Sequence, residues 1–318
     1  MTIALLLIAA GFVLLLYGAD WLVDGAASLA LDLGVSPLIV GLTVVAYGTS
    51  MPELVVSLNA ALQGEGSIAI GNVVGSNICT VGLVLGVPAL ICTLPVQRNT
   101  IRLHAPIMIL GCVLLAVFLT DSIVTRMEGG ILFAGLIGYT ILGFAMERRG
   151  KDTGLVEDGH EKSGKLSKDI GMTLLGMATI IGGGHLMVEG AVSVAHHMGI
   201  SDAVIGLTVV ALGTSIPDLT ASAMAAKKGH GDIAVGNALG SVMFNTYMVM
   251  GISGIFAGPV SGINEAGVAE FTNLDLYVMV GIAALVFPMM LMGMKVRRWQ
   301  GALFVLIYVG YIIVRWPK

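Results

Sequence analysis

Two stretches of this 318-residue sequence are nearly the same, and they decide how the chain folds. Residues 36–61 read SPLIVGLTVVAYGTSMPELVVSLNAA, and residues 201–226 read SDAVIGLTVVALGTSIPDLTASAMAA. Fifteen of the 26 positions are identical, without a gap, at an offset of 165 residues. The same offset aligns GNVVGS at 71–76 with GNALGS at 236–241. The chain therefore contains an internal duplication, and its best-matched part is polar.

The composition places the duplicated chain in a membrane. Apolar residues make up 56% of the sequence, charged residues only 11%, and the mean hydropathy is +0.94. A soluble domain has about a quarter charged residues, so these values exclude a soluble enzyme, a nucleic-acid-binding protein and a disordered chain. The 44 glycines suit close packing of membrane helices. Cys79, Cys92 and Cys112 form no C-x-x-C motif and are interpreted as packing residues.

Hydropathy predicts ten membrane spans of the length a bilayer requires. Their approximate limits are 3–33, 36–62, 67–94, 101–120, 127–146, 170–198, 201–227, 232–257, 273–293 and 299–315. Each half of the chain holds five spans, and because five is odd the second half crosses in the opposite sense. We expect an all-α polytopic membrane protein of ten transmembrane helices, arranged as two inverted five-helix repeats. Transporters use this architecture, with their site near the bilayer midplane.

The charged loop between the repeats predicts the orientation. We expect repeat one at 1–146, a loop at 147–169 and repeat two at 170–318. Placing the loop in the cytoplasm puts 13 of the 16 Lys and Arg residues on that side. The three residues left outside are Arg126, Arg315 and Lys318. This bias predicts a multi-pass protein of the inner or plasma membrane with both termini outside.

Each G-T-S-x-P motif is expected to break its helix. Pro52 and Pro217 lack an N–H and clash with the preceding turn. Backbone carbonyls freed in this way at mid-membrane need partners, and a cation can supply one. Glu53 and Asp218 follow the prolines directly, so each acid stands where the second half-helix begins.

A carboxylate inside a membrane span is costly and is a functional candidate for that reason. Glu53 and Asp218 occupy matching positions, and no Lys or Arg lies inside any predicted span to pair with them. Carboxylate, hydroxyl and carbonyl oxygens suit hard cations such as Ca²⁺ and Na⁺. The structural alternative is two protonated acids that hydrogen-bond helices together. The duplication and the neighbouring hydroxyls favour a cation site.

The G-N-x-x-G-S pair is predicted to form a second polar wall. The residues that build it are Ser76, Asn77 and Thr80 in the first copy and Ser241 and Asn245 in the second. Asn72 and Asn237 are expected to hydrogen-bond the broken helices instead of an ion. Asp24 and Glu189 also match across the repeat, and we interpret them as structural or gating residues.

The paired G-T-S-x-P-[ED] and G-N-x-x-G-S blocks resemble the two α-repeats of the cation/Ca²⁺ exchanger superfamily, in its sodium/calcium exchanger branch. The compact prokaryotic type, without regulatory domains, is the most similar, and the resemblance covers essentially the whole chain. It implies a secondary active antiporter, not an enzyme, that exchanges Na⁺ for Ca²⁺ by alternating access. The implied partners are these two ions and the bilayer, with no prosthetic group, no nucleic acid and no obligate protein partner.

The resemblance also implies roles for individual residues. Glu53 and Asp218 are expected to bind Ca²⁺ at the centre. The residues expected to supply further oxygens, including those of flanking Na⁺ sites, are Thr49, Ser50, Thr214, Ser215, Ser76, Ser241, Thr80 and Asn245.

Departures from the family pattern leave the coupling ion open. Asp218 resembles the potassium-dependent branch, but that branch usually has Asp where this chain has Asn245. The proton-coupled branch usually has an acid where Gly75 and Gly240 stand. Exchange of H⁺ for Ca²⁺, K⁺-dependent exchange and antiport of another divalent cation are therefore the alternatives. Two rivals of a different class are a passive cation channel and an intramembrane aspartyl-type protease.

Overall fold

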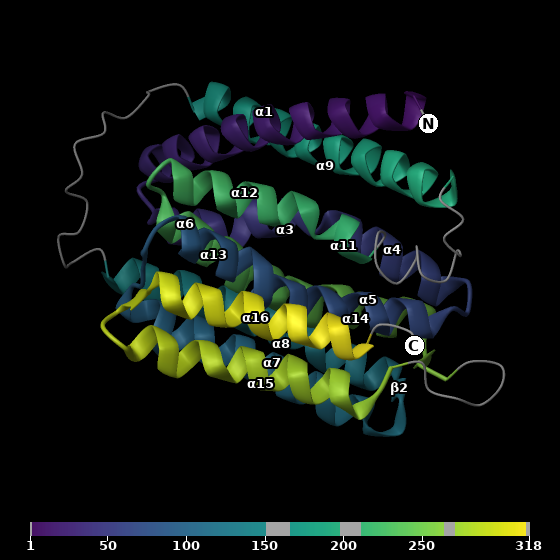
Figure 1. Cartoon of the computed structure of the whole chain (residues 1–318). Coiled ribbons are helices and arrows are strands. Elements are labelled where there is room, and N and C mark those ends of the chain that lie inside the picture. Colours follow the sequence, from purple (N-terminus) through teal and green to yellow (C-terminus); the bar gives the residue numbers. More distant parts are fainter. Residues whose placement is uncertain (1, 151–165, 198–210, 264–270, 316–318) are drawn as a thin grey trace.

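Helices account for almost all of the residues that the computed structural model describes, which are 2–150, 166–197, 211–263 and 271–315 (Figure 1). The first half contains α1 (Thr2–Leu33), α2 (Pro37–Val40), α3 (Ala46–Thr49), α4 (Met51–Leu62), α5 (Gly66–Cys79), α6 (Gly86–Ile91), α7 (Ala105–Phe118) and α8 (Arg126–Gly150). The second half contains α9 (Leu166–His197), α11 (Ala211–Thr214), α12 (Ile216–Lys227), α13 (Gly231–Met243), α14 (Met250–Ala257), α15 (Asn273–Leu291) and α16 (Arg298–Arg315).

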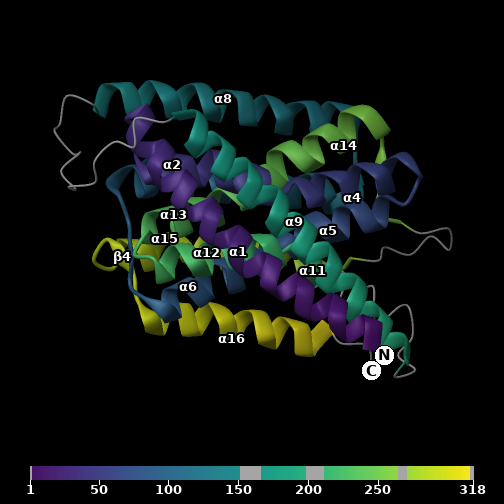
Figure 2. The ribbon, with the colours of Figure 1, turned by 90° about the horizontal axis from the view of Figure 1, so that it is seen from above.

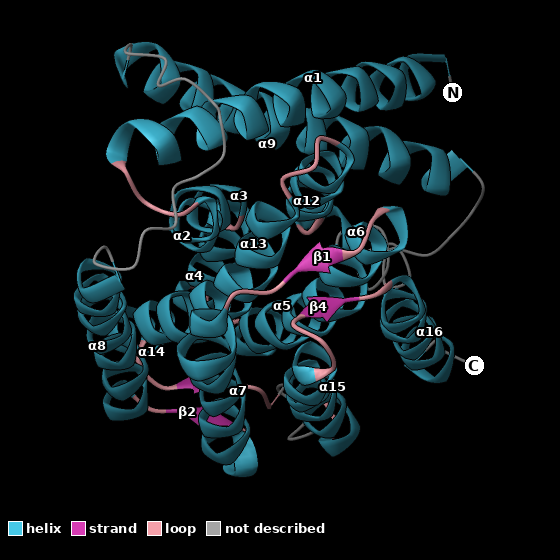
Figure 3. Ribbon diagram, turned by 90° about the vertical axis from the view of Figure 1, so that its left-hand side faces the viewer, coloured by secondary structure: helices cyan, strands magenta, loops and turns pink. Residues whose placement is uncertain are grey.

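Short irregular elements join these helices. The π-helical segments among the described residues are η1 (Gly41–Val45), η2 (Thr80–Leu85), η3 (Thr100–His104) and η6 (Phe244–Val249), and η4 (Leu119–Asp121) is a 3₁₀ turn. Two antiparallel pairs of two-residue strands, which the sequence did not predict, link the halves of the chain. Strand β1 (Leu94–Pro95) pairs with β4 (Lys295–Val296), as Figure 3 shows, and β2 (Ile123–Val124) pairs with β3 (Val260–Ser261).

The duplication in the sequence recurs as a duplicated order of elements. Shifting α4 by 165 residues gives the bounds of α12, and shifting α1 gives those of α9 to within one residue. The α5–η2 pair recurs as α13–η6 in the same way. The first residues of the second copy of the long motif, 201–210, lie outside the described residues.

The described residues include six helices that are long and apolar enough to cross a membrane. They span Thr2–Leu33, Gly66–Ile91, Thr100–Asp121, Leu166–Val194, Gly231–Ala257 and Asn273–Leu291. A seventh candidate is the broken pair Pro37–Thr49 and Met51–Leu62, which bends by 46°. The chain is thus an all-helical membrane protein. Helix α8 ends at Gly150 and α9 begins at Leu166, inside the two ends of the expected 147–169 loop, and 151–165 lies outside the described residues.

Helices α1 and α9 form an antiparallel pair along one face of the molecule (Figures 1 and 2). Glycines spaced by seven residues form the contact, which brings the two backbones together. The stripe on α1 is Gly11, Gly18 and Gly25, and the 165-residue offset carries it onto Gly176, Gly183 and Gly190 of α9. Each helix therefore presents the same surface to the other.

The remaining helices form a block beneath this pair (Figure 3). Helices α4, α5, α12 and α13 lie at its centre, and α7, α8, α15 and α16 lie around them. The central helices carry the duplicated polar motifs. The fold therefore brings the motifs of the two halves, far apart in sequence, into one buried region.

Replacing Gly176 by Val is expected to destabilise the α1–α9 pair by about 1–3 kcal/mol, the usual cost of overpacking. A Cβ at this position would lie 2.4 Å from the backbone nitrogen of Leu22. Gly171→Val, on the same helix, is the matched control because no described atom lies within 4 Å of its Cβ position. Melting temperatures in detergent measure the effect, and equal values for the two variants would contradict this packing.

Candidate functional site

Both proline motifs interrupt their helices, as the sequence predicted. Helix α3 ends at Thr49 and α4 begins at Met51, with Ser50 between them at φ −91° and ψ 9°. Ser215 separates α11 from α12 in the same manner, at φ −87° and ψ −3°. The proline is the second residue of each following helix, where a missing N–H leaves no bond unmade.

The two acids begin the half-helices that follow the breaks. Glu53 is the third residue of α4 and Asp218 the third of α12, and neither is exposed to solvent at all. The first turn of a helix carries partial positive charge, which favours a carboxylate there. The two carboxylates are close enough to interact electrostatically. The fold thus brings together the two acids that the sequence singled out.

Asp218 accepts hydrogen bonds from hydroxyl groups of both halves of the chain. Oδ2 accepts from the Ser50 hydroxyl at 3.2 Å, and Oδ1 accepts from the Ser241 hydroxyl at 3.1 Å and from Thr49. The Thr49 oxygen also lies 2.8 Å from the carbonyl oxygen of Val45, in the last turns before the break. Carboxylate, hydroxyl and carbonyl oxygens therefore converge on the repeat-two acid.

Glu53 is satisfied far less well. Among the described residues, Thr214 is the side chain that acts on it as a hydrogen-bond donor, and neither carboxylate oxygen makes a hydrogen bond of ordinary geometry. The other predicted residues with buried polar atoms that lack a described hydrogen-bond partner are Ser76, Asn77 (its Oδ1), Thr80, Ser215 and Asn245. Leaving such an atom unsatisfied costs about 1–3 kcal/mol. These oxygens suit a hard cation, which would satisfy several of them at once.

Asn72 and Asn237 hold the acid-bearing helices in place, which confirms their predicted role. The Asn72 amide donates to the Glu53 carbonyl oxygen at 3.3 Å and to the Ser57 hydroxyl at 2.9 Å. The Asn237 amide donates to the Asp218 carbonyl oxygen at 3.2 Å and to the Ser222 hydroxyl at 2.9 Å. We call each pair of hydrogen bonds an asparagine bracket, and the two brackets have nearly identical distances.

The π-helical turns at Thr80 and Asn245 were not predicted. Thr80 begins η2, which packs against α12 and α13, and Asn245 lies in η6, which packs against α4 and α5. Thr80 and Asn245 therefore each belong to a π-helical segment that packs against the acid-bearing helix of the other repeat. Single π turns inside helices often occur at functional sites, because they widen the helix locally.

The polar wall also contains a hydrogen bond between the two halves that the duplication does not repeat. The Asn77 amide donates to the Thr246 hydroxyl at 2.8 Å, next to Asn245. Val242 occupies the position that corresponds to Asn77 in the second repeat and cannot make such a bond. Thr246 had not been singled out from the sequence.

The G-x-x-x-G glycines of the second repeat pack closely, as this motif suggests. A Cβ on Gly236 or Gly240 would lie 2.5 Å from a carbonyl oxygen of Leu38 or Leu42, respectively. This contact places α13 against the α2–η1 segment that leads to the first helix break.

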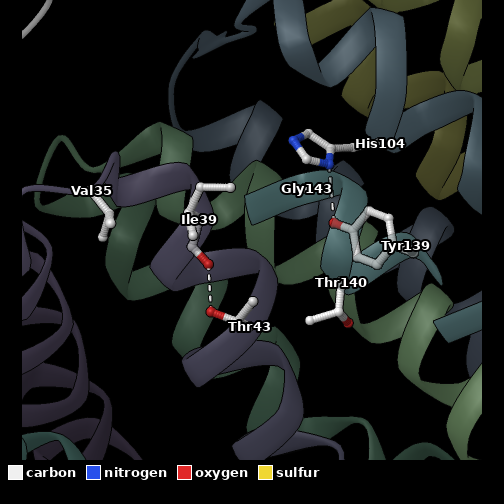
Figure 4. Close-up of a pocket in the computed structure, with 7 residues that line it drawn as sticks. All are labelled: Val35, Ile39, Thr43, His104, Tyr139, Thr140 and Gly143. Atoms are coloured by element: carbon white, nitrogen blue, oxygen red, sulfur yellow. Dashed lines mark hydrogen bonds between the residues drawn. The ribbon is translucent and has the colours of Figure 1, made fainter. Parts of the chain in front are cut away.

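A buried polar pair lies apart from the acids, in a pocket of about 30 Å³ (Figure 4). Nδ1 of His104 lies 3.0 Å from the Tyr139 hydroxyl, which joins η3 to α8. The residues that line this pocket are Val35, Ile39, Thr43, His104, Tyr139, Thr140 and Gly143. None of them belongs to the predicted site.

One further buried acid has a structural explanation. Oδ2 of Asp275 accepts hydrogen bonds from the backbone and hydroxyl of Thr272, which caps α15. Its Oδ1 lies 3.0 Å from Nε of Arg315 and accepts from the Tyr311 hydroxyl at 2.9 Å. Asp275 is thereby satisfied within the fold, in contrast to Glu53.

The chain is similar to known proteins along almost its whole length. The family profile described as sodium/calcium exchanger protein matches residues 3–145 and 168–316. The protein CaxA of Alkalimonas amylolytica is 37% identical over 321 residues, and the sodium/calcium exchanger MaX1 of Methanosarcina acetivorans is 33% identical over 350 residues. Each alignment covers 98% of both chains. The sodium-calcium exchanger NCX_Mj, solved after soaking with 10 mM Na⁺ and 10 mM Sr²⁺, superposes with a TM-score of 0.85 at 29% identity, covering 100% of this chain and 99% of the other.

Replacing Asn237 by Leu is expected to lower the free energy of unfolding by about 1–3 kcal/mol, because a buried carbonyl and a buried hydroxyl lose their donor. Asn59→Leu, on the exposed side of α4, provides the control. Thermal unfolding in detergent distinguishes the two variants. If both melt together, the bracket between α12 and α13 does not stabilise the broken helix.

Proposed function

The chain belongs to the sodium/calcium exchanger protein family, and we propose that it exchanges Na⁺ for Ca²⁺ at the buried pair Glu53 and Asp218. The observation that supports this proposal most strongly is the burial and the proximity of the two acids. Both are fully buried at the starts of broken helices, close enough to interact, among oxygens that lack protein partners. Two carboxylates balance the charge of one Ca²⁺ or of two Na⁺, so the two ions compete for one centre.

The proposed cation ligands come from both repeats. Glu53 and Asp218 supply the charge, and the remaining oxygens are those of Thr49, Ser50, Ser76, Thr80, Thr214, Ser215, Ser241 and Asn245. The hydrogen bonds from Thr49 and Ser50 to Asp218 support this arrangement, because they show that residues of repeat one reach the acid of repeat two. Exchange then follows from charge, because closing the acid pair off without a cation is costly in a low-dielectric interior. The site therefore switches its access from one membrane face to the other only when a cation is bound.

We place this site at the centre of ten transmembrane helices in two inverted repeats, 1–146 and 170–318, joined by the 147–169 segment. The antiparallel packing of α1 on its counterpart α9 supports the inversion, as do the two antiparallel strand pairs that link the halves. The bias of Lys and Arg supports a cytoplasmic 147–169 segment, both termini outside and an inner or plasma membrane location.

The residues around the acids favour Na⁺ as the coupling ion. Asn245 contributes no charge where an acid would favour K⁺, and Gly75 and Gly240 offer no second acid for proton coupling. The family consists of transporters, which leaves no support for a protease. A passive channel differs from an antiporter in one respect, because channel flux needs no counter-cation.

Glu53→Gln and Asp218→Asn are each expected to reduce Ca²⁺ exchange to the level of protein-free liposomes, because each removes one charge from the site at nearly constant volume. The measurement is ⁴⁵Ca²⁺ uptake into proteoliposomes loaded with Na⁺, repeated with internal K⁺, with choline and with an imposed pH gradient. Glu65→Gln, which changes an exposed acid at the start of α5, is the matched control.

Uptake that requires internal Na⁺ supports Na⁺/Ca²⁺ exchange. Uptake driven only by the pH gradient would replace it with proton coupling, and uptake in choline would indicate a channel. Wild-type rates in either acid variant, with normal elution from size exclusion, would remove these residues from the transport site.

Asn245→Asp is expected to make exchange sensitive to K⁺ or to alter the cation preference. It adds, in η6, a third negative charge to those of Glu53 and Asp218. Uptake at varied K⁺, with Sr²⁺ as a competing cation, measures the effect. Asn59→Asp adds the same charge on an exposed face and should change neither property. Identical ion dependence in both variants would mean that Asn245 does not face the ions.

A further inference from the structure

An ion pair fastens α1 to the end of α12, away from the acid centre. Lys228 directly follows α12, and its Nζ lies 2.6 Å from Oδ1 of Asp20 and 2.6 Å from Oδ1 of Asp24. The same ammonium donates to the Asp20 carbonyl oxygen at 3.2 Å. Asp20 and Asp24 are four residues apart and therefore share one face of α1. A single lysine thus forms ion pairs with two aspartates one helical turn apart on α1.

The duplicated half has no equivalent ion pair. The 165-residue offset carries Lys228 to Gln63, Asp20 to His185 and Asp24 to Glu189. Gln63, His185 and Glu189 are all exposed, whereas Lys228, Asp20 and Asp24 are partly buried. Helix α1 packs on α12, but the described part of α9 has no comparable packing on α4. The two-fold relation of the repeats is therefore broken at this contact.

We propose that Lys228, Asp20 and Asp24 form an ionic latch that stabilises the transport conformation in which α1 is docked on α12. The opposite end of the molecule lacks a latch, because Gln63 carries no charge. The latch therefore makes the two conformations of the exchanger unequally populated. This inference rests on the proposed exchange by alternating access. With Lys228 in the cytoplasm, the latched conformation is closed to the cytoplasm and open to the outside.

The partial exposure of the latch fits such a role. The Lys228 side chain is 22% exposed and the two aspartates are 45% exposed, so water screens their attraction. Ion pairs of this kind contribute little, so the latch biases an equilibrium without locking it. A fully buried pair would hold the two helices together too strongly for repeated opening.

Cys92 provides a native reporter for this end of the molecule. It is half-buried, and its Sγ donates to the Ala226 carbonyl oxygen at 3.5 Å, two residues before Lys228. A groove between α1, α6 and α12 runs beside it, lined in part by Leu16 and Ile91. Cys79 and Cys112 are buried. Undocking of α1 should therefore expose Cys92 preferentially.

The test is the rate at which a membrane-impermeant maleimide labels Cys92 in the purified full-length protein, followed by mass spectrometry. Lys228→Gln should accelerate labelling about 2- to 5-fold, the range expected for a partly exposed ion pair. The Asp20→Asn, Asp24→Asn double variant should do the same. Lys228→Arg keeps the charge and should match wild type, as should Lys227→Gln, which changes the adjacent exposed lysine.

Two further measurements separate a latch from a merely structural contact. Gln63→Lys places a cation opposite Glu189 and should also accelerate Cys92 labelling, because it stabilises the opposite conformation. In proteoliposomes, Lys228→Gln should shift the apparent KM for Ca²⁺ in opposite directions at the two membrane faces.

Equal labelling of Lys228→Gln and Lys227→Gln, or failure of Lys228→Arg to restore the wild-type rate, would overturn the latch. Labelling does not require transport. If Lys228→Gln is labelled at the wild-type rate and the wild-type protein shows Na⁺-driven uptake, only the latch is overturned. If Lys228→Gln is labelled faster but the wild-type protein shows no Na⁺-driven uptake, only the exchange proposal is overturned.

Discussion

The burial of two carboxylates in one apolar interior is the constraint on which the rest of this structure depends. Such groups are costly unless polar groups surround them, and both repeats contribute polar groups to this region. The helix breaks turn positive helix ends toward Glu53 and Asp218, and the asparagine brackets fix those ends in place. The second repeat supplies what the first cannot, because a single broken helix presents only one acid.

The two acids are related by the duplication but are not equivalent in their surroundings. Three hydroxyl groups donate to Asp218, whereas neither carboxylate oxygen of Glu53 makes a hydrogen bond of ordinary geometry within the described residues. Asp218 is one methylene shorter, and hydroxyl groups from both repeats surround it.

The local features of the site could be predicted from the sequence, because they follow from residue chemistry at short range. A proline after G-T-S dictates a break, and a buried asparagine next to the broken helix needs hydrogen-bond partners that this helix can supply. The π-helical turns at Thr80 and Asn245 had no such signal, since a one-residue widening depends on packing against distant helices. The same holds for the link from Asn77 to Thr246 and for the attachment of Lys228 to α1. Asp24 is an intermediate case: its match with Glu189 suggested a structural or gating role, but its lysine partner lies 204 residues away in the sequence and could not be predicted.

The glycine stripes of α1 and α9 bear on the origin of the chain. Because the 165-residue offset relates the stripes, each contact between the helices occurs twice, once from each direction. A surface that binds an antiparallel copy of itself is self-complementary, which is the defining property of an isologous dimer interface. Two separate copies of one repeat could therefore pair through this surface, whereas in a single chain each half can carry different residues at matching positions, as Lys228 and Gln63 do.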